Sequence, residues 1–197
     1  MKRICLIILL MAALTTARTQ IREKETVIGL TVGAIALYYG SSYNVSVPPL
    51  TVYGLYGLTG NAFGVERLTI GIGGSAAFMA AKSVTSYGNA TLTSRISETV
   101  ISVKATGEYP LFNVPELDTY ISILLGWGIA RNKNSWEGDA ETIELAKSLG
   151  WEPMDKVGGP LFGITAGCRY WFTEQLAGNV EIGYGPAFLN IGGSYRF

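Results

Sequence analysis

The last eight residues, from Asn190 to Phe197, are the feature that most constrains the fold. Residues here alternate between an oily and a polar face, the first with Leu189, Ile191, Gly193 and Tyr195, the second with Asn190, Gly192, Ser194 and Arg196. A period of two predicts a β-strand. The strand ends on an aromatic carboxyl terminus, whereas the ends of soluble domains usually fray into solvent. We therefore expect a closing strand that is held by its neighbours to the final residue.

The composition favours membrane strands over membrane helices. The chain has 197 residues, 48% of them hydrophobic and only 15% charged, which is oily for a soluble domain of this size. After residue 17, no stretch is apolar for the roughly 18 residues that a spanning helix needs. The 25 glycines and 11 tyrosines suit a small barrel, because glycine permits curvature and tyrosine favours membrane-water boundaries.

The N-terminus has the three parts of a secretory signal peptide. Lys2 and Arg3 precede an apolar run, residues 4–14, and small residues end at Ala17. We expect residues 1–17 to be a signal peptide, 18–25 a periplasmic lead-in and 26–197 the folded barrel. The other interpretation, an anchor helix, suffers from the shortness of the run. Cleavage leaves 13 basic against 15 acidic residues, which argues against nucleic-acid binding.

Alternation along the chain predicts eight strands. We expect them near residues 26–34, 50–58, 65–78, 94–109, 119–131, 160–172, 176–184 and at the C-terminal end. Long connections are expected at 38–48, 79–93 and 132–158, and shorter ones at 59–64, 109–118 and 173–175. The facing of the second strand is ambiguous, and Pro48-Pro49 is expected to open it. The last hairpin has only Gly185-Pro186 as its turn, which fits the switch of inward positions from odd to even numbers.

The fourth strand decides which face is inside. It places Glu98, Lys104 and Glu108 on one face and apolar residues such as Val103 on the other. In a soluble barrel the ionic face would be outside, but in a membrane barrel it must be inside, because a basic residue facing the bilayer midplane costs about 2 to 4 kcal/mol. Together with the later strands, this facing predicts a neutral lumen charge network of Glu98, Lys104, Glu108, Arg169, Glu181 and Arg196. We expect it to hold the barrel together rather than to act as an acid-base site.

The connection at residues 132–158 is the segment most open to a surface role. Asp139 can cap a short helix that Gly150 and Pro153 would end. Trp136 and Trp151 flank that helix, and they either contact a partner or cover the helix. Elsewhere, Trp127 and Trp171 are expected to be anchors at the membrane-water interface.

Several segments resemble one known family. The signal peptide, Pro48-Pro49, residues 169–176 and the end of the chain resemble the small outer-membrane β-barrels of the OmpX-like and opacity-type proteins. The resemblance implies an all-β, eight-stranded antiparallel up-and-down transmembrane barrel with a filled polar lumen, in the outer membrane of a Gram-negative-type bacterium. It also implies contact with outer-membrane lipid, and recognition by the barrel-assembly machinery through a C-terminal signal made by Asn190, Gly192, Tyr195 and Phe197. Members of such a family share architecture but differ in their loops.

The residues offer little for catalysis. The chain has no histidine, which removes Ser-His-Asp catalysis and the commonest metal ligand. Cys168, on a face assigned to lipid, is expected to be inert. We predict no enzyme activity, no cofactor and no metal, and a structural or surface-interaction role. Two alternatives stay open: a narrow channel or an accessory subunit of an export machine, and a soluble periplasmic lipocalin-like binder.

Overall fold

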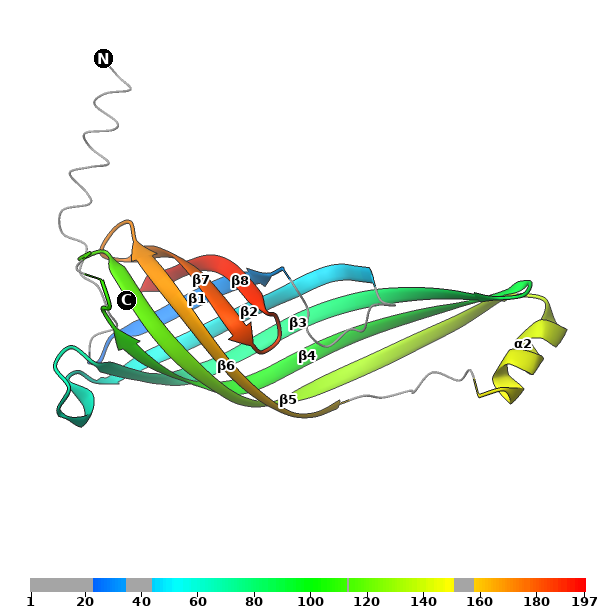
Figure 1. The fold of residues 1–197 in the computed structure, drawn as a ribbon, viewed down its shortest axis with the longest axis horizontal. Helices are drawn as coiled ribbons and strands as arrows, with labels where there is room; N and C mark the ends of the chain where they lie inside the picture. Colours follow the sequence, from blue (N-terminus) through cyan, green and yellow to red (C-terminus); the bar gives the residue numbers. More distant parts are fainter. Residues whose placement is uncertain (1–22, 35–43, 113, 151–157) are drawn as a thin grey trace, which may run out of the picture.

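A computed structural model describes residues 23–34, 44–112, 114–150 and 158–197 (Figure 1). Within these residues, eight antiparallel strands follow one another around a closed barrel, and β8 returns to pair with β1. The all-β, eight-stranded fold class is therefore confirmed. The elements are β1 (Thr26–Gly33), β2 (Asn44–Thr59), the 3-10 turn η2 (Ala62–Gly64), β3 (Thr69–Tyr87), β4 (Ala90–Tyr109), β5 (Leu117–Gly138), α2 (Ala140–Ser148), β6 (Gly158–Trp171), β7 (Leu176–Tyr184) and β8 (Leu189–Arg196).

The seam between β1 and β8 closes the barrel. Its register runs from Val27 opposite Arg196 to Gly33 opposite Asn190. A Cβ atom on Gly192 would lie 2.0 Å from the carbonyl oxygen of Leu30, so the two backbones approach too closely for any side chain there. The seam therefore requires a glycine at position 192.

On the fourth strand, charged side chains near the middle of the barrel point inward and the apolar residues between them point outward. Lys104 and Glu108 are 3% and 0% exposed, whereas Val103 is 56% exposed, which confirms the predicted facing of the fourth strand. The second strand, whose facing was ambiguous, buries Tyr53 and exposes Val52. Exposed apolar residues surround the barrel as an outward belt that includes Ile28, Leu30, Val32, Val52, Ile72, Phe78, Ile101, Val103, Ile121, Ile123, Leu125, Trp127, Ile129, Phe162, Ile164, Ile182 and Ile191.

The two ends of the barrel differ. The C-terminus lies at the end that holds the β2–β3, β4–β5 and β6–β7 turns, which we call the terminal end (Figure 1). Helix α2 lies at the opposite end, the α2 end, beyond the tips of β3, β4 and β5 (Figure 1). Among the described residues, no helix is long and apolar enough to cross a membrane.

The predicted loop at residues 79–93 is wrong. Strand β3 continues to Tyr87 and β4 begins at Ala90, so only Gly88 and Asn89 form the turn. Strand β5 likewise continues to Gly138. Beyond the last pairings with β2 and β6, these strands form a three-stranded extension, residues 83–87, 90–94 and 130–138. The pattern was missed because small polar residues occupy both faces, which removes the contrast that marks a lipid-facing strand.

Other boundaries also differ from the sequence prediction, and β3 begins at Thr69 rather than at residue 65. Strand β2 begins at Asn44, so Pro48 and Pro49 lie inside it rather than before it, at a shift in its register with β3. Such an irregularity is where a strand tolerates proline, because the missing N–H is not needed for the ladder. The connection expected at 132–158 starts only after Gly138.

The predicted turn between β7 and β8 is too short, whereas the predicted cap of the helix is confirmed. The connection between β7 and β8 spans residues 185–188 rather than 185–186, and its length stays even, so the predicted facing of β8 holds. Helix α2 is capped as predicted: the Asp139 carboxylate accepts a hydrogen bond from the Thr142 amide, and Gly150 follows the helix with a φ of 83°. Pro153 lies outside the described residues.

The outward belt predicts that a charge placed on it destabilises the barrel in a membrane. We expect Val103→Arg to lower the free energy of unfolding in lipid vesicles by about 2 to 4 kcal/mol, because the guanidinium would face hydrocarbon. The matched control is Val84→Arg, on the same outer face of the barrel but in the extension, where a change within about 0.5 kcal/mol is expected. Urea titration followed by tryptophan fluorescence measures both. Equal losses at the two positions would contradict the assignment of the belt to lipid.

Candidate functional site

Two buried ion pairs lie at the centre of the lumen. Lys104 Nζ of β4 is 2.6 Å from Glu181 Oε1 of β7, and Arg169 Nη1 of β6 is 3.0 Å from Glu108 Oε1 of β4. All four side chains are less than 10% exposed. Both pairs join strands that are not neighbours, so each ties one wall of the barrel to another. The structure thus brings together four of the six residues of the predicted network.

Aromatic rings surround the first pair. The Tyr120 hydroxyl donates to Glu181 Oε1 at 3.0 Å, and Lys104 Nζ lies 4.5 Å from the centre of the Tyr53 ring. The Tyr53 hydroxyl is 2.7 Å from Ser194 Oγ of β8. These contacts give the buried ammonium a second favourable neighbour besides the carboxylate.

Two glycines make room for those rings. A Cβ atom on Gly29 would lie 2.2 Å from the Tyr53 ring, and one on Gly167 would lie 2.6 Å from the Tyr120 ring. Each ring therefore occupies the space that a side chain would take on the strand it faces. The glycine content of the inner face is part of how the lumen is packed.

A second group of contacts fills the lumen near the terminal end. Trp171 is fully buried there, which corrects the expectation that it anchors at the membrane interface. Its indole N–H donates to Asp118 Oδ2 at 2.6 Å, and the Arg196 guanidinium lies 4.1 Å from the centre of its ring. Arg196 Nη1 is also 3.8 Å from Glu25 Oε2, and its Nε donates to the Glu174 carbonyl.

Asp118 and Glu25 were not identified from the sequence. Asp118 was assigned to a turn because Pro110 and Pro115 precede it, and Glu25 to the charged lead-in. The alternation of the strand could have identified Asp118, because it is two residues before the inward residue Tyr120 and so lies on the same face. No sequence signal separates Glu25 from the other charges of the lead-in.

Glu98 does not join the network. Within the described residues it makes no ion pair or hydrogen bond, and it is only half-buried. The position that a Cβ atom would occupy on Gly128 is 2.6 Å from Glu98 Oε1, so the side chain lies against the neighbouring strand β5. Glu98 is nearer to the α2 end than Lys104 and Glu108, which separates it from both ion pairs.

The other singled-out residues occupy distinct places. Asn190 is buried in the lumen, where its amide donates to the Ala187 carbonyl. Tyr195 and Phe197 lie outward with their ring centres 4.9 Å apart, and the Phe197 amide donates to the Thr26 carbonyl at 2.9 Å. Trp136 is at the end of β5 in the extension, whereas Trp151 lies outside the described residues.

Apolar clusters lie on both sides of the central pairs. One contains Val27, Tyr53, Leu55, Trp171 and Ala177, and the other contains Ala77, Met79, Val100, Leu124 and Leu161. The central carboxylates of Glu108 and Glu181 are each paired with a cation inside the lumen. Among the described residues, no group of three or more His, Cys, Asp or Glu side chains could hold a metal ion. The chemistry of this site is that of a packed ionic core.

Comparisons with known proteins support the fold at low sequence identity. No protein-family model and no curated protein sequence matches the chain. Among solved structures, the Yersinia pestis attachment invasion locus protein Ail, in complex with the heparin analogue sucrose octasulfate, matches with a TM-score of 0.51 and 13% identity over 89% of this chain and 99% of that one. The outer membrane protein OprG from Pseudomonas aeruginosa matches with a TM-score of 0.52 and 13% identity over 89% and 97%. The chain has the fold of these small outer-membrane barrels.

The ionic core yields a stability prediction. We expect Arg169→Met to lower the free energy of unfolding by about 3 to 5 kcal/mol, because it leaves the Glu108 carboxylate buried without its cation. The double variant Glu108→Gln, Arg169→Met should lose clearly less, since it removes both charges. Urea titration of the barrel in lipid vesicles measures both.

The control for this prediction is Glu98→Gln, which removes a carboxylate that has no partner in the described structure. A change within about 0.5 kcal/mol is expected. A loss as large as that of Arg169→Met would place Glu98 in the ionic core after all.

Proposed function

We propose that this protein is a non-enzymatic integral outer-membrane barrel that acts at the cell surface through its extension and α2. The observation that carries the proposal is the outward apolar belt around an ion-paired lumen. Exposed apolar surface on this scale is rare in soluble monomers, and hydrocarbon is the environment that suits it. We therefore expect the outward belt to contact membrane lipid.

The extension of β3, β4 and β5 and the connection that holds α2 support an orientation. In barrels of this kind, short turns face the periplasm and longer segments face the outside. The terminal end would then be periplasmic, with the signal peptide at residues 1–17 directing export and β8 serving as the strand that the assembly machinery recognises. The extension and α2 would be extracellular, where Leu145 of α2 and Leu149 just after it are both more than half exposed.

The two alternative functions have less support. A channel needs an open lumen, but the ion pairs and the two apolar clusters occupy the lumen of the described barrel. A lipocalin-like binder needs an oily cavity inside and polar residues outside, and the facing of Val103 and Lys104 is the reverse. The same ionic core supports a role other than catalysis, because its charges are already neutralised by one another.

Fractionation tests the membrane assignment. We expect the protein in the outer-membrane fraction, and we expect its mobility on a denaturing gel to change when the sample is boiled, because a closed barrel resists detergent until it is heated. A protein found in the soluble periplasmic fraction with no change of mobility would overturn the proposal and favour the lipocalin-like alternative.

Cysteine labelling in intact cells tests the orientation. In a Cys168→Ala background, Leu145→Cys on α2 should react with a membrane-impermeant maleimide, because its side chain is exposed at the proposed outer surface. The matched control is Glu66→Cys, exposed in the β2–β3 turn at the opposite end, which should react only after the outer membrane is permeabilised. The reverse pattern would show that the terminal end is extracellular.

A further inference from the structure

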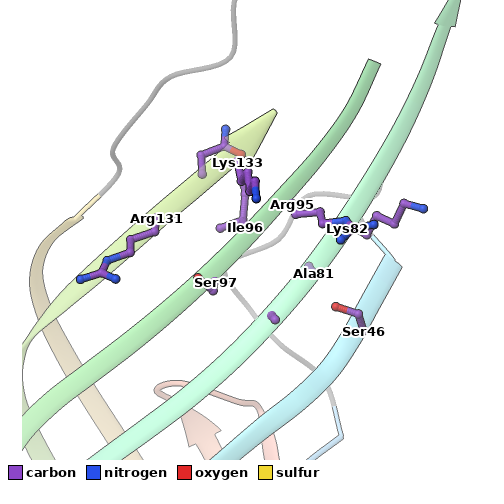
Figure 2. A pocket seen from close by; sticks show the side chains of 10 residues that line it. Ser46, Ala81, Lys82, Arg95, Ile96, Ser97, Arg131 and Lys133 are labelled. Atoms are coloured by element: carbon purple, nitrogen blue, oxygen red, sulfur yellow. The ribbon is translucent and has the colours of Figure 1, made fainter. Parts of the chain in front are cut away.

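Four basic side chains gather on the outer face of the barrel near the α2 end. Lys82 of β3, Arg95 of β4 and Lys133 of β5 lie directly opposite one another in the strand register, and Arg131 is two residues before Lys133 on the same face. We call these four residues the basic row. Figure 2 shows that they line one pocket and come from three neighbouring strands.

The basic row begins where the outward belt ends. On β5, Arg131 is the next outward residue after Ile129, and on β3 Lys82 follows Phe78 and Ala80. Outward residues on one strand are about 7 Å apart along it. Arg131 therefore lies one such step from the edge of the belt, and Lys82, Arg95 and Lys133 lie two steps from it. In a bilayer this is the level at which hydrocarbon gives way to headgroups.

The row concentrates positive charge without compensation from the protein. Directly opposite residues on paired strands have Cβ atoms about 4.5 to 5.5 Å apart, a spacing at which like charges destabilise the sheet. Among the described residues none of the four makes an ion pair or a hydrogen bond through its side chain. The lining of the pocket contains no Asp or Glu, only small, apolar or neutral polar residues besides the four cations. An anion from outside the chain would relieve this repulsion.

We propose that the basic row binds the phosphate groups of a phosphorylated glycolipid in the outer leaflet, an inference that rests on the proposed membrane insertion and orientation. The open pocket has a volume of about 790 Å³, which admits a phosphosugar headgroup. Arginine offers a bidentate fork to phosphate and lysine adds a mobile point charge, so this mixture suits a phosphate ester. Ser46 and Ser97 line the same pocket and supply hydroxyl groups.

Position favours a lipid over a soluble polyanion. The cations lie on the outer wall of the barrel, next to the belt, rather than at the tip of the extension, where a ligand from solution would first arrive (Figure 1, Figure 2). A glycolipid held here places its acyl chains along Phe78 and Ile129, so one molecule satisfies both the charge of the row and the apolar surface beside it. A soluble anion satisfies only the charge.

Native mass spectrometry of the folded barrel in detergent tests the proposal. The probes are lipid A carrying both phosphates and the same lipid A with the phosphates removed. We expect the phosphorylated lipid to bind about tenfold or more tightly than the dephosphorylated one. The double variant Arg95→Gln, Lys133→Gln should lose about tenfold or more of that affinity. The matched control is Arg67→Gln, Lys147→Gln, which removes two exposed cations elsewhere and should bind as the parent does.

Each other outcome has a defined meaning. Equal binding of the two lipids, or equal binding by the double variant and its control, overturns the proposal. Binding of sucrose octasulfate that depends on the row, without binding of lipid A, overturns it in favour of a soluble sulfated polyanion. If the double variant does not fold, the exchange Arg95→Lys, Lys133→Arg keeps the charge and must retain binding, whereas Lys133→Glu alone must weaken it. The mobility shift of the parent on boiling is read separately, so a failure of membrane insertion is distinguished from a failure of lipid binding.

Discussion

The whole architecture depends on the need to satisfy every backbone N–H and C=O group where no water is present. In hydrocarbon an unpaired group costs several kcal/mol, so a sheet can exist there only if it has no edge. The pairing of β1 with β8 removes that edge, and in this seam a Cβ atom on Gly192 would collide with the carbonyl oxygen of Leu30. The alternation of inner and outer side chains follows from this closure, because a closed ring of strands has one face toward lipid and the other toward itself.

The inward side chains then have to fill a narrow lumen. The barrel does so with charges of opposite sign, each held by a partner on a distant strand, and with rings fitted against glycines. Lys104 with Glu181, and Arg169 with Glu108, are typical of buried pairs that fix a geometry more than they add stability, because the cost of removing both charges from water offsets their attraction. The ionic core therefore fixes the relative positions of strands on opposite sides of the barrel.

The sequence predicted the fold where lipid and lumen impose opposite demands. Val103 beside Lys104 is decisive for that reason, because one residue has to face lipid and the other has to face the lumen. Outside the belt, both faces of a strand accept polar residues, so the extension was read as a loop, although Gly88-Asn89 is itself a hairpin signal. The partners of the ion pairs could not be predicted, because contacts across the lumen depend on the stagger of all the strands, which no single hairpin contains. Glu98 shows this limit: its side chain is on the inner face as predicted, but it lies nearer to the α2 end than the two ion pairs.

The lengths of the strands also have a consequence for the order of assembly. The hairpins of β3, β4 and β5 join long strands through short connections, whereas β1 and β8 have eight residues each and come from opposite ends of the chain. Bringing such distant segments together costs more chain entropy than forming a hairpin, and few residue pairs compensate for it. We expect the long hairpins to form early and the seam last. The pairing of the two short strands, β1 and β8, then sets how long the chain remains an open sheet.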